Sequence, residues 1–263
     1  MVGTVIGDIV GSIYEFNNIK TKNFVFFGSG CEATDDSIMA IAVADAIMES
    51  QDSGKPFKDV LRKKFVEYGR KYPWPMGGYG GRFKQWLVSS VHTPYNSCGN
   101  GSAMRVAACG FAAKTVEEAR ELAKQSAEIT HNHPDGIAGA QAVAEAIFLA
   151  KSGCSKAEIA NAVKKYYPVL PDIDVIRPTY GWGAVCSNTV PEAVSCFLQS
   201  TDFEDAIRNA ISIGGDSDTI GAIVGGIAEA YYGVKRNFAF VAKTKLPVDL
   251  RKVLMRFEER YQA

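Results

Sequence analysis

Apolar residues recur at intervals of three and four positions along most of the chain, the spacing that places them on one face of a helix. The clearest examples are residues 38–46, 57–69 and 248–261. No segment sustains the alternation of apolar and polar residues that a half-buried strand requires. The pattern therefore predicts an essentially all-α fold.

The first apolar stretch, residues 2–14, carries Gly3, Gly7 and Gly11 four positions apart. Residues at this spacing share one face of a helix, and glycines on that face let a neighbouring backbone approach closely. Asp8 interrupts the stretch and no basic segment precedes it, so we do not predict a signal peptide. We expect a core helix here that packs tightly against another.

Capping boxes, in which a Ser or Thr at a helix start is followed three residues later by Glu, predict helices in the middle of the chain. They pair Thr115 with Glu118, Ser155 with Glu158, and Thr189 with Glu192.

Segments 72–82 and 166–186 contain several Pro, Gly and aromatic residues, and we predict loops there. Asp172 and Asp174 in the second loop have no helix start to place them, so we predict that they are solvated. Long loops often border a ligand site, and the sequence leaves open which of the two covers it.

Two short acidic segments stand at the start of apolar helices. Thr34-Asp35-Asp36-Ser37 leads into one, and Asp216-Ser217-Asp218-Thr219 leads into the other. Both can be ordinary caps that never meet, because free backbone N–H groups stabilise a carboxylate at a helix start. If they do meet, four negative charges in one cleft must be protonated or neutralised by cations. Carboxylate and hydroxyl oxygens without a Cys or His ligand select Mg²⁺, Mn²⁺ or Ca²⁺ over zinc.

Three further features could contribute to a site. Glu15 lies among large apolar residues and is either a solvated helix end or a buried carboxylate whose pKa is open to tuning. The segment 95–105 is either an Asn-Gly turn or a cradle of backbone N–H groups for phosphate. His131 lies two residues before His133, and we interpret it as a turn histidine or a ligand-contacting one.

The composition restricts the classes of partner. The chain has 263 residues, of which 47% are hydrophobic, enough for the core of one domain. Lys and Arg number 29, as do Asp and Glu, so no net charge draws the protein to nucleic acid or to a membrane. No apolar run is long enough to span a bilayer. Six cysteines without a CxxC pair predict free thiols. We expect residues 1–263 to form a single domain, monomeric and cytoplasmic.

Taken in chain order, several motifs resemble those of the ADP-ribosylglycohydrolase family. That family includes the dinitrogenase-reductase-activating glycohydrolases and the ADP-ribosylarginine and ADP-ribosylserine hydrolases. The motifs are Gly7-Asp8 with Gly11-Ser12-Ile13-Tyr14-Glu15, Thr34-Asp35-Asp36, Gly99-Asn100-Gly101-Ser102-Ala103-Met104-Arg105, Thr130-His131 and Gly214-Gly215-Asp216-Ser217-Asp218-Thr219. The resemblance implies a compact orthogonal bundle of helices with a binuclear Mg²⁺ or Mn²⁺ centre in the cleft between the acidic turns.

The resemblance also implies roles for individual residues. The metal ligands would be Thr34, Asp35, Asp36, Asp216, Asp218 and Thr219. The residues that line the diphosphate and ribose of the substrate would be Ser97, Gly99, Asn100 and Gly101, with Met104 nearby. His131 would help hold the distal ribose or phosphate. Glu15 would match a mobile acidic residue that closes over the metals, and either Glu15 or Asp35 would transfer the catalytic proton.

The activity that the resemblance implies is metal-dependent hydrolysis of the glycosidic bond between ADP-ribose and an acceptor, such as an arginine or serine side chain of a protein. One alternative is hydrolysis of a small ADP-ribosyl metabolite or of ADP-ribose linked to a nucleic-acid end. Another is a non-catalytic relative, since lens crystallins resemble the family in fold. Oxygen donors at all six ligand positions argue against a purely structural role.

Overall fold

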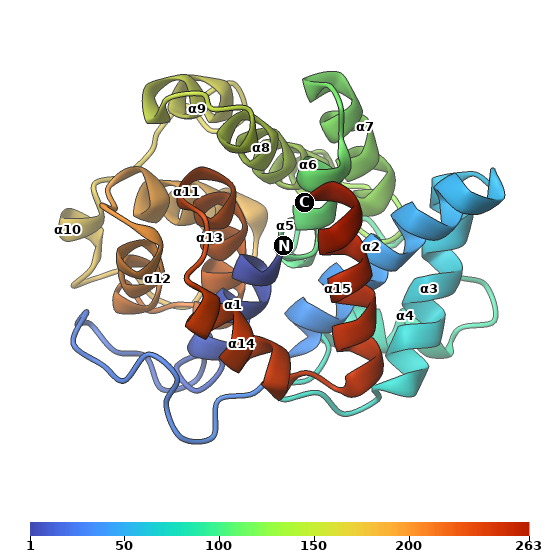
Figure 1. The fold of residues 1–263 in the computed structure, drawn as a ribbon, viewed down its shortest axis with the longest axis horizontal. Coiled ribbons are helices and arrows are strands. Elements are labelled where there is room, and N and C mark those ends of the chain that lie inside the picture. The colour runs from blue at the N-terminus through green and yellow to red at the C-terminus, as the bar shows by residue number, and fades with distance from the viewer. Residues whose placement is uncertain (263) are drawn as a thin grey trace.

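The computed structural model describes residues 1–262 and is all-α, as the hydrophobic pattern predicts (Figure 1). In chain order its α-helices are α1 (Val2–Gly11), α2 (Asp35–Ser53), α3 (Phe57–Lys71), α4 (Gly81–Val88), α5 (Gly101–Met104), α6 (Ala107–Ala112), α7 (Val116–Ala127), α8 (Pro134–Lys151), α9 (Lys156–Val163), α10 (Ile173–Ile176), α11 (Val190–Leu198), α12 (Phe203–Ser212), α13 (Ser217–Tyr232), α14 (Arg236–Lys245) and α15 (Val248–Tyr261). A 3₁₀ helix, η1 (Cys186–Asn188), precedes α11. Extended pairing within residues 1–262 is limited to two isolated bridges. In the same range, no helix has the length and apolar character needed to cross a bilayer.

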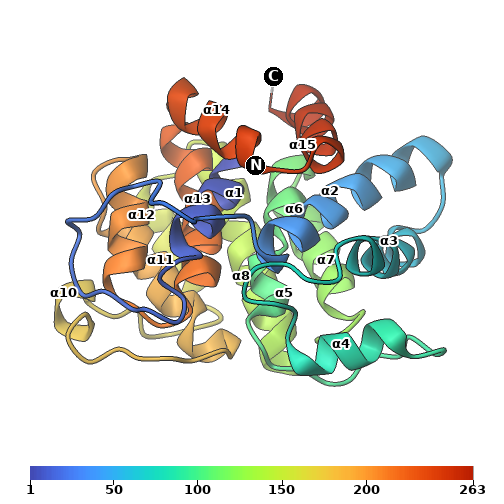
Figure 2. The same ribbon diagram turned by 90° about the horizontal axis from the view of Figure 1, so that it is seen from below.

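Helices α1 and α13 lie side by side at the centre of the molecule in both views (Figures 1 and 2). Gly3 lies against Gly225 at one end of the contact, and Gly7 lies against Gly221 one turn further along α1. The two helices therefore run antiparallel. A Cβ atom on Gly7 would come within 1.8 Å of the Gly221 carbonyl oxygen, so the backbones touch directly. The close packing predicted from the glycine spacing is confirmed.

The antiparallel contact determines where the segments next to these helices meet. At the C-terminal end of α1, a Cβ on Gly11 would lie 2.6 Å from the Asp218 Cα atom at the start of α13. The loop that follows α1, which carries Glu15, therefore begins beside the second acidic turn.

The other helices surround this pair. Figure 2 shows α11 and α12 on one side and α2 and α3 on the other. Buried apolar residues of both sides belong to one hydrophobic cluster that includes Ile6, Ile41, Phe65, Phe197 and Ile223. The core thus extends across the molecule and supports α1 and α13 from both sides.

Two local predictions were wrong. Thr189 stands at the N-cap of α11, but its side chain makes no capping hydrogen bond: its hydroxyl instead lies between the Asn100 side-chain amide and the Gly183 carbonyl, so a tertiary contact replaces the expected capping box. Asp172 does stand at a helix start, because its carboxylate accepts a hydrogen bond from the Asp174 N–H and caps α10. Both aspartates are exposed, as predicted. The capping box of Ser155 with Glu158 forms.

Replacing Gly7 with alanine should destabilise the fold strongly, because the added methyl group would collide with the α13 backbone. We expect the free energy of unfolding to fall by about 3 kcal/mol or more, as in severe overpacking of a core. The measurement is urea denaturation followed by circular dichroism. Gly81→Ala is the matched control, since it also adds a methyl group to a helical glycine but meets no atom within 4 Å. Equal effects of the two substitutions would contradict the close contact of α1 and α13.

Candidate metal and substrate site

The two acidic turns meet in the structure. The Thr219 hydroxyl donates a hydrogen bond of 2.9 Å to Asp36 Oδ1, joining residues 183 positions apart. Asp36 and Asp218 are both buried. The alternative that the turns are separate helix caps is therefore wrong.

Asp8 holds the first acidic turn in place. It lies fully buried in α1, and its carboxylate accepts hydrogen bonds from the N–H and hydroxyl of Thr34, at 3.0 and 2.7 Å, and from the N–H and hydroxyl of Ser37. Burial raises the pKa of Asp8 to about 6, against the opposing effect of these hydrogen bonds. From the sequence, Asp8 excluded a signal peptide and formed part of a motif that resembles the family, but no role at the site was predicted for it. The signal that could have identified it is an acid inside a glycine-rich apolar helix.

The second turn depends on its glycines and on a polar clamp. Gly214 and Gly215 have φ angles of 74° and 78°, a region that side chains rarely allow. The Asn18 side chain accepts from the Gly215 N–H at 2.7 Å and donates to the Gly215 carbonyl at 2.9 Å. It also donates to the Glu15 carbonyl, at 3.0 Å, so the same residue ties the Glu15 loop to this turn.

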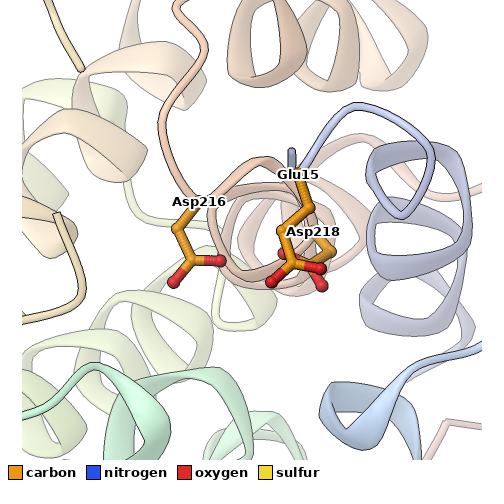
Figure 3. A group of neighbouring side chains, drawn as sticks. All are labelled: Glu15, Asp216 and Asp218. Carbon is orange, nitrogen blue, oxygen red and sulfur yellow. The ribbon is translucent and has the colours of Figure 1, made fainter. Parts of the chain in front are cut away.

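Three carboxylates converge where the two segments meet (Figure 3). Glu15, Asp216 and Asp218 each offer an oxygen within 4.8 Å of the others. Asp216 also accepts a hydrogen bond of 2.7 Å from the Asn100 side chain, which fixes its orientation. Asp35 and Asp36 line the same cavity.

The acidic cluster, which we define as Glu15, Asp35, Asp36, Asp216 and Asp218, has no compensating cation of its own: within residues 1–262, none of the five forms an ion pair with Lys or Arg. Burial, and then repulsion from neighbouring carboxylates, raises the pKa of Asp35, Asp36 and Asp218 well above the usual range. The same causes raise the pKa of Glu15 to about 7. An oxygen-only set of carboxylates with these shifts fits hard divalent cations such as Mg²⁺ or Mn²⁺.

A cavity of about 320 Å³ opens from the acidic cluster. Of the residues predicted for the site, those that line it are Glu15, Asp35, Asp36, Ser97, Gly99, Asn100, Gly101, Met104, His131, Asp216, Asp218 and Thr219. Thr34 does not line it; its hydroxyl caps α2 behind Asp36. Gly78 and Arg82 from one predicted loop and Trp182 from the other form its walls, so both loops border the cavity.

The segment 97–101 lines the cavity, but it is not a simple phosphate cradle in which all backbone N–H groups are free. The Gly99 N–H donates to the Ser97 hydroxyl and the Asn100 N–H donates to the Ala184 carbonyl, both at 3.0 Å. These two backbone groups are therefore engaged within the protein. The glycines at 99 and 101 leave open space near His131, because a Cβ at either position would come within 3.4 Å of its ring.

Comparison with known proteins shows the family of the chain. The family model of the ADP-ribosylglycohydrolases matches residues 1–261, so the chain belongs to this family, as its motifs predict. Among similar proteins, ADP-ribosylhydrolase ARH3 of Homo sapiens is 27% identical, with 89% of this chain and 84% of ARH3 covered. ADP-ribosylarginine hydrolase Tri1 of Pseudomonas putida (strain GB-1) is 25% identical, with 89% of this chain and 70% of Tri1 covered. A solved structure described as an ADP-ribosylglycohydrolase-related protein complex has the same fold, with a TM-score of 0.73 at 19% identity over 98% of this chain and 95% of the other.

The acidic cluster should make the stability of the metal-free protein depend on pH. A carboxyl group with a raised pKa binds its proton more tightly in the folded state, so its stabilising effect is complete at low pH and is lost as pH rises through the folded-state pKa. Glu15, with a pKa of about 7, loses its contribution as pH rises through neutrality, and the raised pKa values of Asp35, Asp36 and Asp218 act in the same direction. Buried His131 acts in the opposite sense only below its ordinary pKa of 6.5.

We therefore predict that the melting temperature in chelator falls, relative to that in Mg²⁺ or Mn²⁺, between about pH 6.5 and 8. Added Mg²⁺ or Mn²⁺ should restore it at the upper end, because a cation that binds the folded state stabilises it. Scanning calorimetry at several pH values measures both effects. The buried amino group of Met1, whose pKa burial lowers from 8.0, acts in the opposite sense in both conditions, so the two melting temperatures are compared at each pH. A difference between them that does not grow over this range would contradict the proposed cation site.

Proposed function

We propose that this member of the family hydrolyses the glycosidic bond between ADP-ribose and a modified acceptor in a reaction that depends on two divalent cations. One observation carries the proposal: five carboxylates from three segments of the chain border one cavity without a Lys or Arg partner. A purely structural protein would gain nothing from this arrangement, since buried carboxylates without compensation destabilise the fold.

The residues proposed to hold the cations are Thr34, Asp35, Asp36, Asp216, Asp218 and Thr219. Bound there, the cations would orient the vicinal hydroxyls of the distal ribose and lower the pKa of a nearby water. The protein prepares these ligands through hydrogen bonds of its own: Asn100 orients Asp216, and the Thr219 hydroxyl orients Asp36.

Glu15 is the residue proposed to supply the proton for the leaving group. Its Oε2 atom is buried and has no hydrogen-bond partner among the described residues, and its pKa of about 7 leaves it partly protonated near neutral pH. In the reaction, a water oxygen bonds to the anomeric carbon as the bond to the acceptor breaks. Asp35 accepts a proton from this water, and Glu15 gives its proton to the leaving atom.

The acceptor is proposed to be an arginine or serine side chain of a protein. The name of the relative Tri1 specifies arginine, whereas that of ARH3 specifies no acceptor.

A mixed pool of arginine-linked and serine-linked ADP-ribosyl peptides, incubated with Mg²⁺ or Mn²⁺ and analysed by mass spectrometry, distinguishes the two acceptors. We expect release of ADP-ribose from one class, and its loss on adding chelator or in Asp218→Ala. If neither class reacts while ADP-ribose still binds, the proposed acceptor is wrong, and a small ADP-ribosyl metabolite or a non-catalytic role takes its place.

Glu15→Gln should lower kcat by about 100-fold or more, because an amide cannot donate the proton that a carboxylic acid supplies. The Kd of ADP-ribose, measured by calorimetry, should change by less than about threefold, since the substituted side chain keeps its size. Glu32→Gln is the matched control, because Glu32 is exposed in the same loop and should leave both quantities unchanged. Equal losses in turnover and binding would mean that Glu15 positions the ligand and does not transfer a proton.

A further inference from the structure

A buried arginine stands beside the cavity without a carboxylate partner. Arg105 is only 2% exposed and lines the cavity, yet it forms no ion pair with Asp or Glu within residues 1–262. Its guanidinium lies 4.5 Å from the centre of the Phe65 ring, and its Nη2 donates to the Ser126 carbonyl at 2.8 Å and to the Thr130 hydroxyl at 2.9 Å. An unpaired buried charge is costly, so the interactions that it does make should matter.

Thr130 connects this arginine to His131. A hydroxyl has one proton to donate and two lone pairs to accept with. Because an arginine can only donate, Arg105 occupies one lone pair of Thr130 Oγ1. His131 Nδ1 lies 2.7 Å from the same oxygen, within reach of the remaining Thr130 proton, and the Tyr95 side chain also hydrogen-bonds to Thr130.

The other ring nitrogen of His131 faces the segment that lines the cavity. A Cβ on Gly101 would lie 3.2 Å from Nε2, and one on Gly99 would lie 3.4 Å from it. Nε2 makes no hydrogen bond to any of residues 1–262. It is therefore the His131 atom available to a ligand that enters the cavity.

We propose that Arg105 and Thr130 are positioning residues that commit His131 to the tautomer with its proton on Nε2, so that the cavity presents an N–H donor to an oxygen of the substrate. The identity of that oxygen, on a phosphate or a ribose of ADP-ribose, rests on the proposed function. The tautomer itself is inferred from the Arg105, Thr130 and His131 contacts and does not rest on the proposed function.

The charge state of His131 agrees with this arrangement. Burial, and then the positive charges of Arg105 and Arg82, lowers the pKa of His131 well below its usual value. The ring is therefore neutral near pH 7 and carries a single N–H. In a neutral imidazole the position of that proton decides whether a substrate meets a donor or an acceptor.

Nitrogen NMR of the ¹⁵N-histidine-labelled protein tests the tautomer directly. The chain has three histidines, and a His131→Asn variant assigns the signals of His131. We expect an acceptor-type Nδ1 and a protonated Nε2 in the ligand-free protein. The reverse pattern, with the proton on Nδ1, would overturn the proposal, because Thr130 would then be accepting from the ring and donating elsewhere.

The Thr130 hydroxyl is tested by Thr130→Val, which keeps the shape of the side chain. We expect a mixture of tautomers and a Kd for ADP-ribose raised about tenfold, the usual effect of losing one hydrogen bond. Thr130→Ser should restore both values. Thr4→Val is the matched control, since Thr4 is also buried but its hydroxyl has no partner. A tautomer that is unchanged in Thr130→Val would show that Arg105 and Thr130 do not position the ring.

The experiment separates this proposal from the proposed function. An Nε2-protonated His131 in a protein that fails to bind ADP-ribose leaves the positioning role intact and refutes the substrate. An Nδ1-protonated His131 in a protein that releases ADP-ribose from peptides refutes the positioning role alone.

Discussion

The direct backbone contact between α1 and α13 is the constraint on which the rest of the site depends. With glycines on both sides of the contact, Gly11 lies against Ser217 and Asp218. This proximity brings three features together: Glu15 just beyond α1, the second acidic turn at the start of α13, and Asp8 within α1, which holds the first turn. A larger separation of the helices would move the acidic turns apart.

The buried carboxylates impose a second constraint, which is electrostatic. Each can remain charged only if its neighbours or a bound cation compensate for the lost hydration. Four hydrogen bonds from Thr34 and Ser37 compensate the Asp8 carboxylate for its lost hydration, so its role is structural. Each carboxylate of the acidic cluster has fewer hydrogen-bond donors than Asp8, and the cluster faces the cavity. This difference in compensation separates the carboxylate that builds the site from those proposed to bind metal.

Local patterns predicted much of this structure, and tertiary contacts explain the rest. The spacing of Gly3, Gly7 and Gly11 was enough to predict the close helix contact, because that information lies within one helix. The meeting of the acidic turns could not be derived from spacing, since the Asp36 and Thr219 contact joins distant parts of the chain. The family resemblance implied it instead.

The wrong prediction for Thr189 and the unpredicted role of Asp8 have the same physical origin. Thr189 matches a capping pattern, but its hydroxyl contacts Asn100, and no local rule contains that contact. The role of Asp8 depends on partners 26 and 29 residues away, so an acid in an apolar helix was visible in the sequence while its function was not.

The central claim is that the two acidic turns bind divalent cations between them. Anomalous diffraction from crystals grown with Mn²⁺ tests it most directly, because the signal locates the ion without assuming a function. We expect two manganese peaks within coordination distance of the carboxylate oxygens of the two turns, with Asp36 and Asp218 among the ligands. Bound manganese that lies elsewhere, with no peak between the turns, would contradict it.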